Sequence, residues 1–318
     1  MSCTIIPRST DFSRLNDVDS VITLHRVNKQ TIITIVSTLF ALFAFAGNSV
    51  LCRLALGENT IDAASFTSIR LLSGIVVLAV ILKMTDRSSE QNSKGSWAAS
   101  VMLFLYAVGF SFAYLSLDTG TGALILFAVV QITMIFASII SGNKLHYSEW
   151  VGLVIAFSGF FYFVLPSLTS PSLSGFLLMT GAGVAWGIYT LKGRGSKNPF
   201  SDTAFNFIRT LPFVVILMVV TFKDALITQQ GILLAILSGA IASGIGYAVW
   251  YIALVRLSTS QAAVVQLFVP IIAAFGGVIF ANEIVSLRLV LSSIMVLGGM
   301  MIVVLGGYLK IDSALRKN

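Results

Sequence analysis

Amide side chains inside long apolar runs are the groups of this chain best suited to contact a solute. Gln131 stands in the middle of the run 120–140, and Asn48 and Gln266 stand in two other runs. A polar group in hydrocarbon needs a hydrogen-bond partner, a cavity or a route to the interface. Gln131 is too deep to reach either interface, so it contacts a solute or bonds a neighbouring helix, a contact typically worth about 0.6–2 kcal/mol. For the shallower Asn48 and Gln266, the bond between helices is the favoured interpretation.

Four aromatic residues form the next set of candidates. Tyr106 is central in its run, and Tyr247 lies in one half of another. A buried tyrosine hydroxyl needs a partner, so both tyrosines are candidates for the wall of a cavity. Trp186 and Trp250 lie just inside one end of their runs. A belt at the membrane interface and a position in a cavity explain these two tryptophans equally well.

Two arginines and one proline complete the candidates. Arg70 and Arg209 lie inside apolar runs, and each follows an isoleucine. A charge at the centre of a bilayer costs about 2.5–3.5 kcal/mol, but neither arginine is central, and each could extend to the nearer interface. Pro270 removes a helical hydrogen bond from the run that also carries Gln266, so we expect a hinge there.

The amino-acid composition indicates the class of protein in which these candidate residues must be held. Of the 318 residues, 57% are apolar and 10% are charged, and the mean hydropathy is +0.94. Soluble domains average about 25% charged residues. The composition therefore excludes a soluble enzyme, a disordered chain and a nucleic-acid-binding module. The net charge of +7 is explained by cytoplasmic loops, which retain Lys and Arg during membrane insertion.

Ten apolar runs predict an all-α polytopic membrane protein. Most of them reach the roughly 17–25 residues that cross a bilayer, and they are continuously apolar, unlike barrel strands. The runs are Thr31–Cys52, Ala63–Leu82, Ser96–Leu117, Gly120–Ile140, Glu149–Leu165, Leu173–Thr190, Asp202–Phe222, Gly231–Ala253, Thr259–Phe280 and Leu289–Leu309. With the N-terminus inside, the inner segments hold 15 Lys and Arg residues and the outer loops hold 3. We therefore expect both termini in the cytoplasm.

The second half of the chain repeats the first. An offset of 139 residues aligns Phe66, Ile69, Arg70 and Leu72 with Phe205, Ile208, Arg209 and Leu211. Each copy holds five spans, an odd number, so the copies are expected to be inverted in the membrane and to enclose a solute site near its middle. The equivalence of Arg70 and Arg209 suggests one shared role, lining two vestibules or, as we favour, anchoring loops. The predicted parts are a cytoplasmic tail 1–30, a first five-helix repeat 31–165, a second repeat 172–309 and a cytoplasmic tail 310–318.

This arrangement resembles the drug/metabolite transporter superfamily, specifically its EamA-type members. The Ile-Arg pairs of spans two and seven carry the resemblance, as does the part of the chain that follows span eight. That part contains Ala253-Leu254-Val255-Arg256, Ser260-Gln261-Ala262-Ala263, Pro270, Asn282-Glu283 and Gly298-Gly299. The first repeat departs from the pattern, with Lys144 in place of Glu283 and Gln131 in place of Pro270.

The resemblance implies a secondary transporter whose spans one, three, four, six, eight and nine surround the pathway. We expect it to export small organic solutes across a plasma membrane, the inner membrane of a bacterium, by alternating access. Amino acids, including aromatic ones, are the first expected substrates, because neutral amide and aromatic candidates suit them better than phosphorylated solutes. Cationic drugs and nucleosides are the alternative. Its expected partners are the solute and the lipid bilayer, and not nucleic acid.

Groups for covalent chemistry are missing from the spans. No Asp or Glu lies near the middle of a run, and no phosphate-binding Gly-x-x-x-x-Gly-Lys loop is present. The chain has two cysteines, Cys3 and Cys52, and two histidines outside the runs. We therefore expect no enzyme activity and no cofactor or metal. A membrane enzyme would need ionisable groups converging on one pocket, and a channel would need a continuous pore.

Overall fold

The apolar runs form helices because a backbone in lipid can satisfy its hydrogen bonds only within itself. The computed structural model describes residues 12–85, 94–142, 147–164, 173–193, 196–254, 256–257 and 265–315. The helices of the first repeat are α1 (Phe12–Gly57), α2 (Ala63–Thr85), α3 (Trp97–Ala113), α4 (Thr119–Ile140) and α5 (Tyr147–Val164). The predicted first span lies within α1, which begins earlier than expected, so residues 12–30 continue the helix.

The second repeat contains more interrupted helices than the first. Its helices are α6 (Leu173–Gly193), α7 (Pro199–Arg209), α8 (Leu211–Thr221), the short η2 (Phe222–Asp224), α9 (Gln229–Ile236), η3 (Leu237–Ile245), α10 (Gly246–Leu254), α12 (Val269–Ala281) and α13 (Leu287–Leu315). Six helical segments are long and apolar enough to cross a membrane, and three shorter apolar helices lie in α3, α12 and α13. With α5 they make ten membrane-crossing segments in the described part of the chain, which confirms the predicted fold class.

Spans seven, eight and nine are not continuous α-helices. Span seven divides at Thr210 into α7 and α8, and α8 carries a proline in its first turn. The middle of span eight, η3, is a π-helix. Span nine is interrupted by a turn at Leu267 and Phe268, immediately before α12; its residues 258–264 lie outside the described residues. Pro270 is therefore in the first turn of α12, where its missing N–H group breaks no helical hydrogen bond.

The two repeats pack on each other through equivalent helices, so that the helix contacts made by one repeat are also made by the other. In chain order α1 corresponds to α6, α3 to the segment α9–η3–α10, and α4 to α12. The first helix of each repeat packs on the third and fourth of the other: α1 on η3, α10 and α12, and α6 on α3 and α4. The fifth helices, α5 and α13, pack on each other. Reciprocal contacts of this kind define a two-fold interface. Since each repeat contributes five spans, the second copy is inverted relative to the first.

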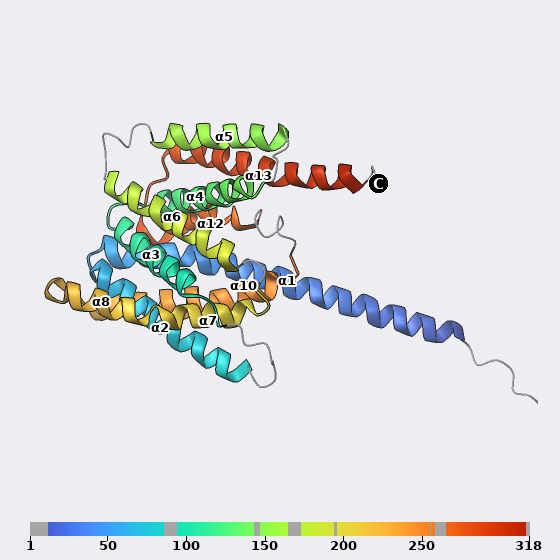
Figure 1. Ribbon diagram of the computed structural model, residues 1–318, viewed down its shortest axis with the longest axis horizontal. Helices are drawn as coiled ribbons and strands as arrows, with labels where there is room; N and C mark the ends of the chain where they lie inside the picture. The colour runs from blue at the N-terminus through green and yellow to red at the C-terminus, as the bar shows by residue number, and fades with distance from the viewer. Residues whose placement is uncertain are drawn as a thin grey trace, which may run out of the picture.

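The two ends of the described chain lie on the same side of the molecule. In Figure 1, the beginning of α1 and the end of α13 point the same way, as an even number of spans requires. The helices α5 and α13 lie along one edge, and α2, α7 and α8 lie along the opposite edge. We call the side at which α1 ends at Gly57 and α12 ends at Ala281 the Glu283 face, and the opposite side the terminal face.

Small residues let the central helices approach closely. Gly183 and Gly187, one turn apart on α6, lie against Val129 and Thr133 of α4. On the outer pair, Gly152 of α5 lies against the backbone of α13. In lipid, where apolar surface is already solvated by the acyl chains, such close van der Waals contact drives helix association. These small residues are thus used for packing between the two repeats.

Backbone and carboxylate contacts tie loops of one repeat to the other at both faces. At the Glu283 face, Thr228 N–H donates to Thr60 O (3.0 Å) and Asp62 N–H to Leu226 O (2.9 Å). At the terminal face, Asp202 accepts from Gly95 N–H (2.6 Å) and Asn206 from Ser96 N–H (2.9 Å). Each tie joins the beginning of one repeat's second span to a loop of the other repeat.

Replacing Asp62 by alanine is expected to lower stability by about 1–2 kcal/mol. Its carboxylate caps α2 through Ala64 N–H (3.0 Å) and Ser65 N–H (2.9 Å), and it also accepts from Leu226 N–H (3.0 Å). The measurement is thermal unfolding of the detergent-solubilised protein. Asp224→Ala, at an exposed carboxylate of the same face, is the control. Equal unfolding temperatures for the two variants would contradict the capping role.

Candidate functional site

A small cavity lies between the two repeats. Its volume is about 20 Å³. Its walls come from α1, α3 and α4 of the first repeat and from α6, η3, α10 and the described beginning of the interrupted ninth span of the second. The lining residues are Phe45, Asn48, Tyr106, Phe110, Leu126, Phe127, Trp186, Ala242, Ser243, Tyr247 and Gln266. None of these side chains is charged, so the wall itself is aromatic and neutral.

Aromatic rings form the largest part of the wall. The ring centroid of Trp186 lies 4.6 Å from that of Tyr106 and 5.3 Å from that of Tyr247. Phe45 continues the series, 5.6 Å from Tyr247. Tilted rings at these distances attract one another and hold their positions without using their polar atoms. The rings therefore pack on one another through their faces and edges, and the tyrosine hydroxyls can bond other groups.

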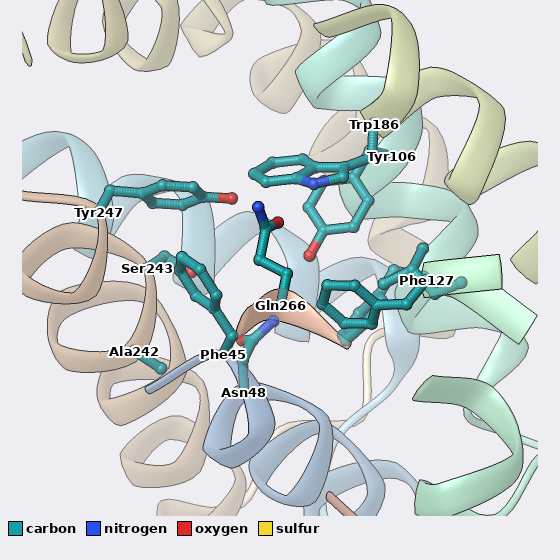
Figure 2. A pocket seen from close by; sticks show the side chains of 11 residues that line it. Phe45, Asn48, Tyr106, Phe127, Trp186, Ala242, Ser243, Tyr247 and Gln266 are labelled. Atoms are coloured by element: carbon teal, nitrogen blue, oxygen red, sulfur yellow. The ribbon is translucent and has the colours of Figure 1, made fainter. Parts of the chain in front are cut away.

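Amide groups lie among the rings. Figure 2 shows the side chain of Gln266 extending between Tyr247 on one side and Tyr106 and Trp186 on the other. Asn48 lines the cavity and accepts a hydrogen bond from Ser238 of η3 at 2.5 Å. Asn48 therefore also joins α1 to η3, which agrees with the bond between helices that we favoured for it. These amides offer both donors and acceptors near the rings.

The π-helix η3 brings span eight to the cavity. Its small residues let it lie directly on α2, where Gly239 contacts the backbone of Arg70. The wider turn of a π-helix changes the register of the side chains that follow. Ala242 and Ser243 of η3 and Tyr247 of α10 thereby line the cavity, while Ser238 contacts Asn48.

Arg70 is buried inside the protein. It is 3% exposed, and its Nη2 donates to the Tyr106 hydroxyl at 3.1 Å. Its guanidinium carbon lies 4.9 Å from the ring centroid of Phe110. Both contacted residues line the cavity, so Arg70 lies directly behind the cavity wall.

Arg209 has a different environment from its counterpart in the first repeat. It donates to the carbonyl of Lys94 in the loop before α3, and its guanidinium carbon lies 5.8 Å from the ring centroid of Trp97. Arg209 thus contacts a loop of the other repeat, as the anchoring hypothesis expects. The two equivalent arginines therefore contact different groups.

A cluster of charged side chains lies at the Glu283 face. Arg53 at the end of α1 lies 3.2 Å from Glu283 and 3.4 Å from Asp118. Glu283 also accepts from the backbone N–H of Thr119 (2.8 Å) and from its hydroxyl (3.0 Å). Asn282, in a left-handed conformation at φ 52°, ends α12 and turns the chain toward α4. The carboxylate of Glu283 therefore caps the first turn of α4, where a helix N-terminus favours negative charge.

The structure brings together five of the residues that we selected as solute-binding candidates. Asn48, Tyr106, Trp186, Tyr247 and Gln266 line one cavity. The two other candidates do not line it, although both are buried. They are Gln131, one turn beyond Phe127 on α4, and Trp250, whose ring packs on Phe45 at 5.8 Å.

Sequence reasoning missed several residues of the site. Phe45 and Ser243 carry no signal of their own in an apolar sequence, although Phe45 precedes Asn48 by three residues and shares its helix face. Arg53 is one of the three basic residues that the sequence places in the outer loops. Its charge next to the end of a span is the signal that points to it. Lys144, compared with Glu283 in the repeat, lies outside the described residues.

The sequence model of the EamA-like transporter family matches residues 32–165 and again residues 173–305. The chain belongs to this family. Two matches in one chain agree with two copies of a five-helix unit. The protein is therefore a multi-pass membrane transporter of small solutes, rather than an enzyme, and it works in a lipid bilayer.

Relatives from bacteria and archaea extend over most of this EamA-family chain. An uncharacterized protein of Pseudomonas aeruginosa is 44% identical over 270 residues, covering 85% of this chain and 94% of that protein. An uncharacterized transporter of Archaeoglobus fulgidus is 27% identical, covering 76% and 88%. One solved crystal structure matches with a TM-score of 0.59 at 15% identity, covering 84% of this chain and 98% of the other, and this likeness shows the fold alone.

Proposed function

We propose that this EamA-family transporter exports small amphipathic organic solutes across the plasma membrane, with amino acids, including aromatic ones, as the first substrates. The observation that carries the proposal is the neutral cavity of rings and amides between the repeats. Aromatic faces and amides suit a solute with an apolar side chain and a polar backbone. Phosphorylated solutes usually recruit several basic groups, and no basic residue lines this cavity.

The size of the cavity supports alternating access. Sites for small organic molecules usually measure about 300–1,000 Å³, and this cavity measures about 20 Å³. A solute therefore enters only after the repeats move apart. Because the repeats are inverted copies, the same motion can open either side. The interruptions at Thr210 and before Pro270 are the expected places for bending, with Pro270 as the hinge of span nine.

We further propose that the terminal face is cytoplasmic and the Glu283 face external. The distribution of Lys and Arg supports this orientation, and we place the protein in the inner membrane of a bacterium. In this orientation the charge cluster around Glu283 closes the external side. The 1–30 and 310–318 segments are then cytoplasmic, and the repeats 31–165 and 172–309 form the transporting body.

Export of cationic drugs or nucleosides is the alternative within the same fold. The lining residues include no carboxylate to pair with a cation, whereas the tilted rings would also stack on a nucleobase. The observation therefore favours neutral or zwitterionic solutes over cations.

Counterflow into proteoliposomes, with amino acids, nucleosides and cationic drugs tested separately, decides among these substrates. We expect accumulation of aromatic amino acids by the unmodified protein. Trp186→Ala should reduce it at least tenfold, because Trp186 forms the centre of the ring wall. Trp150→Ala, at a 54% exposed tryptophan of α5, is the matched control and should leave transport unchanged. Accumulation of nucleosides or drugs without amino acids would overturn the substrate proposal.

A further inference from the structure

Arg70 is a buried cation whose hydrogen-bonding capacity is only partly used. It is 3% exposed, and its guanidinium lies against the rings of Tyr106 and Phe110, 5.4 and 4.9 Å from their centroids. Nη2 donates to the Tyr106 hydroxyl at 3.1 Å, but Nη1 has no hydrogen-bond partner among the described residues. A buried charge usually has a paired counterion and a full set of hydrogen bonds.

The described residues supply no counterion to Arg70. Their ion pairs join Arg53 to Asp118 and to Glu283, and none includes Arg70. The guanidinium contacts the hydroxyl and ring of Tyr106 and the ring of Phe110. Such groups attract a cation far less than a carboxylate does. The buried positive charge is therefore left uncompensated by the described part of the chain.

The geometry directs this charge toward the cavity. Tyr106 and Phe110 both contact Arg70 and both line the cavity. Because the Tyr106 oxygen accepts from Arg70, the hydroxyl can donate its own hydrogen to another acceptor. Figure 2 shows this hydroxyl pointing toward the Gln266 side chain within the cavity. A hydrogen bond from a phenol that is itself bonded to a cation is strengthened by that charge.

We propose that Arg70, acting through the Tyr106 hydroxyl, selects substrates that carry one carboxylate. This inference rests on the proposed function and names the group of the substrate that is recognised. One guanidinium matches one monoanion, whereas phosphate groups recruit several basic side chains. The aromatic wall then receives the apolar part of the same solute. Arg70 is thus a positioning residue that supplies the charge, and Tyr106 is the residue that contacts the carboxylate.

The test compares ligands that differ in the carboxylate. Stabilisation of the purified protein against heating is titrated with L-phenylalanine, with 3-phenylpropionate, which lacks the amino group, and with L-phenylalaninamide, which lacks the carboxylate. A ligand that binds the folded state raises the unfolding temperature according to its affinity. We expect both carboxylates to bind the unmodified protein at least tenfold more tightly than the amide.

Variants show whether Arg70 recognises the carboxylate of the ligand or only supports the structure of the cavity. Arg70→Gln should weaken binding of both carboxylates tenfold to a hundredfold and change amide binding little, and Arg70→Lys should restore part of the preference. Tyr106→Phe, which keeps the ring, should weaken the preference in the same direction. Arg209→Gln is the matched control from the other repeat and should keep the preference unchanged. If Arg70 had only a structural role, Arg70→Gln would weaken the binding of the carboxylates and of the amide equally.

The outcomes distinguish this inference from the proposed function. If amino acids are transported but Arg70→Gln and Tyr106→Phe keep the preference for the acid, the role of Arg70 is overturned and the function stands. If 3-phenylpropionate binds through Arg70 but amino acids are not transported, the amino-acid substrate fails and carboxylate recognition stands. If neither carboxylate stabilises the unmodified protein, the role of Arg70 is overturned.

Discussion

Replacing Gly239 by alanine is expected to lower the unfolding temperature and the yield of folded protein. A methyl group at this position would lie well within 3.0 Å of the backbone oxygen of Arg70 and of the Ser73 hydroxyl. The serine can rotate, but the backbone oxygen moves only if α2 and η3 separate. Overpacking of this kind costs about 1–3 kcal/mol and sometimes more, and it outweighs the roughly 1 kcal/mol that alanine gains over glycine in a helix. The yield of monodisperse protein and its unfolding temperature measure the effect.

Gly181→Ala is the matched control for the change at Gly239. Gly181 lies in α6, and a methyl group there would have no atom within 4 Å. This variant should be as stable as the unmodified protein or slightly more stable. If the two alanine variants unfolded at the same temperature, the close contact between α2 and η3 would not be needed for folding.

Glu283→Gln is expected to open the Glu283 face at least tenfold more often. The change removes the charge that pairs with Arg53 and weakens the cap on α4. Charge-assisted bonds of this kind are worth about 1.5–3 kcal/mol, and about 1.4 kcal/mol shifts an equilibrium tenfold. The reporter is a cysteine at Ser243 in the cavity wall, in a chain with Cys3→Ser and Cys52→Ser. Its reaction rate with a membrane-impermeant thiol reagent is measured in right-side-out and inverted vesicles.

Three further variants show whether a change in the labelling rate comes from loss of the ion pair between Arg53 and Glu283. Arg53→Gln should accelerate labelling as Glu283→Gln does, and the double variant should add little, because both remove the same ion pair. Asp224→Asn, at an exposed carboxylate of the same face, should leave the rate unchanged. A labelling rate that Glu283→Gln leaves unchanged in both kinds of vesicle would show that the cluster does not hold this face closed.

The sequence alone determined the all-α membrane architecture and its construction from two five-helix repeats. Helices that cross lipid must be continuously apolar over a fixed length, and this is a local property that can be read without knowing any contact. The matched positions around Arg70 and Arg209 indicated the repeat, and five spans per copy implied inversion. The π-helix in span eight could not be read from the sequence in this way. Whether a span such as Leu237–Ile245 forms an α-helix or a π-helix depends on what packs against it.

The tertiary structure alone decided which residues share the cavity and what each charge contacts. All sides of a membrane helix are apolar, so the sequence does not tell which side faces a neighbour and which faces lipid. Arg53 and Glu283 lie 230 residues apart in the chain, and no local pattern pairs them. Arg70 and Arg209 are equivalent in sequence, yet one is buried beside the cavity and the other contacts a loop. Inverted copies of one sequence pattern meet different neighbours, and these neighbours determine the role of each residue.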